Sequence, residues 1–414
     1  MTAASQGVER PAHIPESAIY SFDMYRDVAV ENPHASVERL IQDASPVFWT
    51  PHNGGHWMVL SYAAAQEVFR HPEIFSSALV APEIMEATLA ALPPGTPRPP
   101  IPTPLMMDPP EHTRYRQPLM RAFSPKMLMA LRGSIEDLAI KLIDGVADQG
   151  ECEFVSAVAE QFPVRVFLEM MGLPKARLAE FRALAHEVFT PRDHNDPAQA
   201  FHLMRKIVDA LHDDIVARRD HPQQDLISDL WAMSIDGEPM TMELIEDYIV
   251  LLFLAGLDTV VIALSFGVYH LAANPDLQQE LRAHPDLIGE ASEELLRRYS
   301  FTVPVRRVVK ETELHGQTLQ PDDRVILYLP AVDLDPEEFH EPATVDIHRQ
   351  RKAHMLFGGG PHHCLGSHLA RLELQTLYRV LLERLPPFTL APDNPPTFHV
   401  GMNLSLSSLP IRWA

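Results

Sequence analysis

Apolar positions recur at helical spacing in several long stretches of the chain, and this pattern predicts a mainly helical protein. The periodic stretches cover residues 126–148, 174–190, 197–219, 241–272 and 275–299. A last long helix is expected to begin near Cys364 and to end before Pro386, because proline cannot continue a helix. The fold class indicated is mainly α with a small β part.

Short alternating stretches predict that β part. Residues 46–60 resemble two strands around an Asn53-Gly54-Gly55 turn, and Ser61 is placed to cap a helix that runs to Phe69. Further strands are expected within 302–330 and 397–413. Between residues 82 and 107 the chain is rich in proline and predicts a long loop, which in a compact protein is usually functional or disordered. No interdomain linker is evident, so we expect a single domain over 1–414 with an N-terminal arm at 1–30.

The most apolar stretch, residues 248–272, is long enough to span a bilayer. Asp258 lies near its centre, where a charge in a membrane would be costly. A buried helix of a large soluble protein is therefore the favoured interpretation.

Composition narrows the function classes. The formal net charge of −22 makes nucleic acid an unfavourable partner. Two cysteines, Cys152 and Cys364, cannot form a disulfide framework and indicate a reducing compartment. The first residues contain no apolar segment of the kind found in signal peptides, so we expect a cytoplasmic protein without a membrane anchor.

Cys364 has the most informative surroundings. Glycines 358–360 allow a tight turn and a close backbone approach, and the predicted helix N-terminus favours a thiolate. On these local features three interpretations stay open. They are a buried structural cysteine, a soft ligand for iron, and a zinc or copper site completed by nearby histidines, namely His362, His363 and His368.

A wider motif surrounds this cysteine. It reads Phe-Gly-x-Gly-x-His-x-Cys-x-Gly from Phe357 to Gly366 and resembles the haem-binding loop of the cytochrome P-450 family. Other segments similar to family motifs occur in the expected order, namely "DPPEHTRYR", "AGLDT", "EELLR" and "RVVKET". The resemblance covers nearly the whole chain and is greatest to the soluble bacterial members that include the camphor 5-monooxygenases.

The resemblance implies a cytochrome P-450 fold, with haem b between the central helix and the Cys364 loop. It makes Cys364 the iron ligand and gives Thr259 and Asp258 catalytic roles in oxygen activation. Haem contacts are implied for His112, Arg116, Arg307, His362, Phe357, Gly358, Gly366, Ala255 and Gly256. A buried structural network is implied for Glu294, Arg297 and Arg349.

The implied activity is insertion of one atom of O₂ into a C–H bond. By position, the substrate pocket would contain Leu251, Leu254, Val303, Val305, Met402 and Asn403. These residues are mostly apolar, so we expect a small apolar substrate such as a terpenoid or norisoprenoid, beneath a lid formed by 82–107. That loop lacks the tyrosine with which camphor hydroxylases bind their substrate's ketone.

Electrons are expected from NAD(P)H through a ferredoxin reductase and a [2Fe–2S] ferredoxin, because the chain contains no flavin or nucleotide motif. The basic residues expected to dock the ferredoxin are Arg116, Arg351, Lys352 and Arg371. Two alternatives remain: a peroxide-driven haem enzyme acting on fatty acids or aromatics, and a non-catalytic metal- or haem-binding protein.

Overall fold

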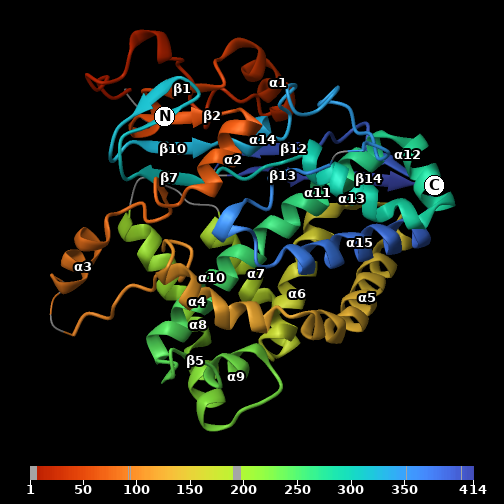
Figure 1. Ribbon diagram of the computed structural model, residues 1–414. Helices are drawn as coiled ribbons and strands as arrows, with labels where there is room; N and C mark the ends of the chain where they lie inside the picture. Colours follow the sequence, from red (N-terminus) through yellow and green to blue (C-terminus); the bar gives the residue numbers. More distant parts are fainter. Residues whose placement is uncertain (1–6, 92, 94, 190–196, 351, 402) are drawn as a thin grey trace.

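The computed structural model describes residues 7–91, 93, 95–189, 197–350, 352–401 and 403–414. A helical body makes up most of the molecule, and a smaller β region lies at one side of it (Figure 1). The larger helices are α1 (Pro33–Asp43), α2 (Tyr62–Arg70), α3 (Pro82–Ala90), α4 (Glu111–Ala122), α5 (Pro125–Ala147), α6 (Gln161–Met170), α7 (Leu178–Phe189), α8 (Pro197–Asp220), α9 (Leu226–Trp231), α10 (Met242–Gly256), α11 (Asp258–Ala273), α12 (Pro275–Ala283), α13 (Ile288–Arg298) and α15 (Ser367–Arg384).

The main sheet joins strands from distant parts of the sequence. Its order is β1 (Val47–Thr50), β2 (His56–Val59), β10 (Arg324–Leu327), β7 (Val305–Val308) and β3 (Phe75–Ser76). A three-stranded sheet contains β11 (Phe388–Leu390), β14 (Pro410–Trp413) and β4 (Glu151–Glu153), and β12 (Thr397–Val400) pairs with β13 (Leu404–Ser408). Two small hairpins are formed by β5 (Ser234–Ile235) with β6 (Glu238–Pro239) and by β8 (Thr312–Leu314) with β9 (Gln317–Leu319).

The apolar stretch expected to be one helix over 241–272 is divided into α10 and α11 at Leu257. The Thr259 hydroxyl donates a hydrogen bond of 2.9 Å to the Ala255 carbonyl, a back-bond that often bends helices. By length and composition Met242–Ala273 resembles a membrane span, but most of its apolar window is buried against the rest of the protein. The central helix therefore has the character of a core helix.

Two other expectations needed correction. The periodic stretch 275–299 is broken at His284 and Pro285 into α12 and α13. The Pro-rich segment contains a helix, α3, whose first helical residue is Pro82. Proline is well tolerated at that position, so a proline-rich composition did not exclude a helix there.

A buried ion network fixes the irregular chain that leads to Cys364. The Glu294 and Arg297 side chains are fully buried and pair through two hydrogen bonds of 2.8 and 2.9 Å. Arg349 donates to the same carboxylate at 3.0 Å, and Arg297 also donates to the carbonyls of Asp333, Pro342 and Thr344. Because both charges are paired and the remaining donors are used, the network can be buried without an orphaned charge.

Candidate active site

Cys364 lies in the turn that precedes α15, two residues before the N-cap Gly366. Its backbone N–H donates to the Phe357 carbonyl at 2.8 Å, which closes the loop. Gly360 has a positive φ of 60°, and a Cβ there would lie 2.0 Å from the Phe69 carbonyl oxygen. The glycine run therefore lets the Cys364 loop pack directly on the end of α2.

Opposing effects act on the Cys364 thiol. Cys364 is exposed to the cavity, but the protein packed around the loop desolvates the thiol, and this largest effect raises its pKa above the ordinary value. The backbone N–H groups of Gly366 and Ser367 and the charges of Arg116 and Arg371 act to lower it. The helix N-terminus thus contributes as expected but does not outweigh burial. A bound metal ion would deprotonate the thiol outright.

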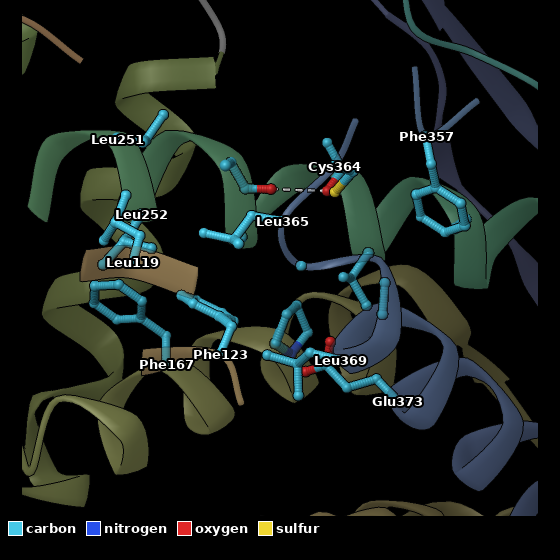
Figure 2. A pocket seen from close by; sticks show the side chains of 18 of the residues that line it. Leu119, Phe123, Phe167, Leu251, Leu252, Phe357, Cys364, Leu365, Leu369 and Glu373 are labelled. Carbon is cyan, nitrogen blue, oxygen red and sulfur yellow. Dashed lines mark hydrogen bonds between the residues drawn. The ribbon is translucent and has the colours of Figure 1, made fainter. Parts of the chain in front are cut away.

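A cavity of about 340 Å³ separates the Cys364 loop from the central helix. Ala255, Gly256 and Thr259 line it on the side of α10 and α11. Figure 2 shows other side chains around it, mostly apolar, including Leu119, Phe123, Phe167, Leu251, Leu252, Leu365 and Leu369. A sulfur ligand and a threonine hydroxyl therefore share one apolar cavity.

Two histidines that line the cavity have unused hydrogen-bonding atoms. The His112 and His362 rings lie 4.1 Å apart, centroid to centroid. Both ring nitrogens of His112 and the Nε2 of His362 are buried without a partner among the described residues. Burial lowers the pKa of His112 to about 4 and that of His362 to about 3, so both rings are neutral near pH 7. Such unsatisfied groups indicate a polar ligand at this position.

The neighbouring arginines differ from expectation. Arg307 donates to the Ala78 carbonyl and pairs with Asp322 at 3.0 Å. Arg306 instead lies close enough to His362 to lower that residue's pKa, and burial lowers its own pKa to about 10. Side chains alternate along β7, so adjacent arginines face opposite sides of the sheet. The geometry therefore favours Arg306 over Arg307 as the cation beside these histidines.

Asp258 follows the break in the central helix and has no ion-pair partner among the described residues. The Asn403 amide donates to its Oδ2 at 3.4 Å, which lowers the pKa of Asp258. Burial has the larger, opposite effect and raises that pKa to about 6. The carboxyl can therefore gain or lose a proton near neutral pH.

Glu373 is a functional candidate that the sequence reasoning missed. It lines the cavity from α15 (Figure 2), and burial raises its pKa to about 8, so the carboxyl is mostly neutral at pH 7. Its only sequence signal was a carboxylate between two leucines, which is common on helix surfaces.

Comparisons with known proteins agree with this arrangement. The family profile described as "Cytochrome P450" matches residues 188–292 and 286–413. A probable cytochrome P450 127A1 of Sinorhizobium fredii is 31% identical, with 98% of this chain and 97% of that protein aligned. The chain is a cytochrome P450. The monooxygenase PikC of Streptomyces venezuelae is also 31% identical, over 88% of this chain and 86% of its own length.

Solved cytochrome P450 structures have the same fold. CYP101J2 superposes with a TM-score of 0.86 at 31% identity, covering 98% of this chain and all of that one. CYP101C1 gives 0.87 at 29% identity with the same coverage. Both neighbours belong to the group that contains the camphor hydroxylases. The expected single-domain cytochrome P-450 fold and the monooxygenase class are therefore confirmed.

Family and fold imply a cysteine-ligated haem b, and the residues of this chain fit it. Cys364 lies on one wall of the cavity and would supply the sulfur ligand. The unpartnered nitrogens of His112 and His362, with Arg116 and Arg306 nearby, fit two haem carboxylates that need buried donors. Phe357, Gly366, Ala255 and Gly256 also line the cavity, as expected, whereas Gly358 is not among its lining residues.

The expected substrate residues are only partly brought together. Leu251 lines the cavity, but Leu254, Val303 and Val305 are not among its described lining residues. Asn403 bonds to Asp258, and Met402 lies outside the described residues. Pro104 and Leu105, from the segment expected as a lid, also line the cavity, and so does Thr302.

The choice between the two arginines gives a direct prediction. Arg306→Gln should lower the fraction of purified protein that retains haem, because buried carboxylates lose a cationic partner. Arg307→Gln is the matched control one residue away and should retain haem like the unaltered protein. The readout is the ratio of haem to protein absorbance after gel filtration. Haem loss in the Arg307 variant alone would contradict the assignment.

Proposed function

We propose that this cytochrome P450 hydroxylates a small apolar compound, such as a terpenoid or norisoprenoid, in the cytoplasm. The supporting observation is the cavity itself, whose walls are apolar apart from a few polar groups near the cysteine and the central helix. Burying the apolar surface of a substrate in this cavity would contribute about 25 cal/mol per Å² to its binding free energy. We assign to Thr302, which is half-buried on the cavity wall, a hydrogen bond to one substrate oxygen.

Bound haem would supply the activation of O₂, and the surrounding residues would supply its protons. The Asp258 carboxyl has a pKa of about 6, so it can take up and release a proton close to the pH at which a donor works best. Thr259 keeps its hydroxyl on the cavity wall, and its oxygen can accept a hydrogen bond while it donates to Ala255. We assign Asp258 as the proton donor and Thr259 as the hydroxyl that passes the proton into the cavity. This pair favours the use of O₂ over a peroxide-driven reaction.

The electron donor is proposed to be an acidic [2Fe–2S] ferredoxin, reduced from NAD(P)H by its reductase. Two of the expected docking residues already form ion pairs within the protein. Lys352 pairs with Glu290 at 2.6 Å, and Arg371 pairs with Glu293 at 2.7 Å. Arg351 lies outside the described residues. Arg116 donates to the His363 carbonyl and so connects α4 to the Cys364 loop.

A better docking surface extends from α4 into α5. Residues 112–135 contain no acidic residue although the whole chain has 56. Arg121, Lys126 and Arg132 are exposed, and no ion pair joins them to another described residue. Met120 and Met129 are 55% and 79% exposed beside them. Unpaired positive charge around exposed methionines on an otherwise acidic protein suits an acidic partner.

The substrate proposal is tested by spectral titration. Monoterpenoids and norisoprenoids should displace water from the ferric iron and shift the haem toward high spin, whereas medium-chain fatty acids should not. Several terpenoids of similar size should bind, because an apolar site discriminates weakly among isosteres. Binding of fatty acids alone would contradict the proposed substrate class.

The proton relay predicts a specific pH dependence, measured as kcat with a substrate found in the titration. The neutral Asp258 carboxyl is the donor, so kcat should fall as pH rises through about 6. Asn403→Leu removes the donor that stabilises the carboxylate and should move this inflection to higher pH. Asp258→Asn should abolish the inflection and lower kcat about 10²–10⁴-fold. An inflection that persists unchanged in Asp258→Asn would exclude this residue.

The docking surface is tested by charge reversal. Arg121→Glu with Lys126→Glu should raise the ferredoxin concentration required for half-maximal reduction and weaken its salt dependence. Lys310→Glu, an exposed base in the β region, is the control and should have little effect. Lys352→Glu tests the docking surface first expected, which the double reversal leaves unchanged. A larger defect in that variant than in the double reversal would return docking to the residues first expected.

A further inference from the structure

A second buried carboxylate lies on the central helix, away from the proton relay. Asp247 is on α10, only 5% exposed. Both of its oxygens accept hydrogen bonds of 2.8 Å from Arg98. One oxygen also accepts from the Ile101 backbone N–H at 2.8 Å, and the other from the Thr103 hydroxyl at 3.4 Å. All these donors belong to the Pro-rich segment.

These contacts join two walls of the same cavity. The segment that Asp247 holds continues directly to Pro104 and Leu105, which line the cavity. On the other side, α10 continues from Asp247 for one turn to Leu251 and Leu252, which also line it. The Asp247 carboxylate therefore provides most of the hydrogen bonds that attach the Pro-rich segment to α10, and Arg98 adds one of 3.4 Å to the Glu243 carbonyl.

The chain changes from exposed to buried at the contact between Arg98 and Asp247. The α3 helix buries none of its residues, and Leu79, Val80 and Ile84 are exposed. Among the described residues of 79–97, the hydrogen bonds run within that segment and none joins it to the rest of the chain. From Pro100 to Pro104 most residues are buried. Figure 1 accordingly shows α3 standing away from the helical body.

We propose that Arg98 and Asp247 form a clamp that sets the width of the cavity mouth and thereby selects ligands by size. Residues 98–105 form the fixed edge of the mouth, and residues 79–91 form a flap beside it. The two clamp residues act through the position of Pro104 and Leu105, so they are positioning residues. This inference rests on the proposed function, because it assumes that ligands reach the haem site through this cavity.

The clamp itself is tested by hydrogen exchange of the haem-loaded protein. Arg98→Gln removes the ion pair, and Asp247→Ala removes both carboxylate oxygens, leaving only the 3.4 Å contact of Arg98 with the Glu243 carbonyl. Both should increase exchange of the backbone amides in residues 101–107, by about tenfold or more, because charge-assisted hydrogen bonds are lost. Glu243→Gln is the matched control, since Glu243 is an exposed acid one turn earlier on the same helix. Its side chain makes no described contact with the segment, so exchange should not change.

Size selection is tested by stopped-flow binding of imidazole and 4-phenylimidazole to the ferric protein, followed through the Soret band. Arg98→Gln and Asp247→Asn should accelerate association of the larger ligand about tenfold and that of imidazole much less. Asp247→Asn keeps the shape of the side chain, so this test does not require that the Asp247→Ala protein folds.

The outcomes separate the clamp from the proposed function. Unchanged exchange in both Arg98→Gln and Asp247→Ala would overturn the clamp. Faster exchange with equal acceleration of both ligands would overturn size selection and leave a purely structural contact. Absence of any Soret shift with imidazole in the unaltered protein would instead contradict the haem site, while the exchange comparison would still decide whether the clamp exists.

Discussion

The site depends on one constraint: a soft sulfur ligand must be held rigidly at the edge of an apolar cavity. Two separate features provide this rigidity. Gly360 packs on the backbone of α2 where no larger residue fits, and the Glu294–Arg297–Arg349 network fixes the irregular chain that leads to the loop. Both lie outside the cavity, so the immediate surroundings of Cys364 can serve ligand binding instead of structural support.

Polar groups inside the cavity are few, and most are left incompletely satisfied by the protein. His112 and His362 have unpartnered nitrogens, and Glu373 is mostly neutral because it is buried. Asp258, beside Thr259 but not among the lining residues, has an amide as its only described hydrogen-bond donor. Elsewhere in the described core, buried charges such as Glu294 and Asp247 are fully paired. Within the cavity, the unpartnered histidine nitrogens fit a bound cofactor, whereas paired carboxylates such as Glu294 and Asp247 hold the fold.

Much of this could be predicted from the sequence, because the loop around Cys364 and the Glu294 pair belong to motifs that resemble those of a known family. What could not be predicted depended on strand register and tertiary burial. Arg306 and Arg307 are adjacent, and only the pairing of β7 decides which side each one faces. Asn403 bonds to Asp258, and Arg98 bonds to Asp247. The partners are 145 and 149 positions apart in the sequence, so no local pattern predicts these contacts. The helix α3 was missed because proline content obscured a permitted N-terminal proline.

The central claim is that Cys364 binds the haem iron through its sulfur. The most direct measurement is the absorbance spectrum of the dithionite-reduced protein under carbon monoxide. Thiolate ligation predicts a Soret maximum near ~450 nm that is absent in Cys364→His. A maximum near ~420 nm in fresh native protein, unaltered by that substitution, would contradict the account.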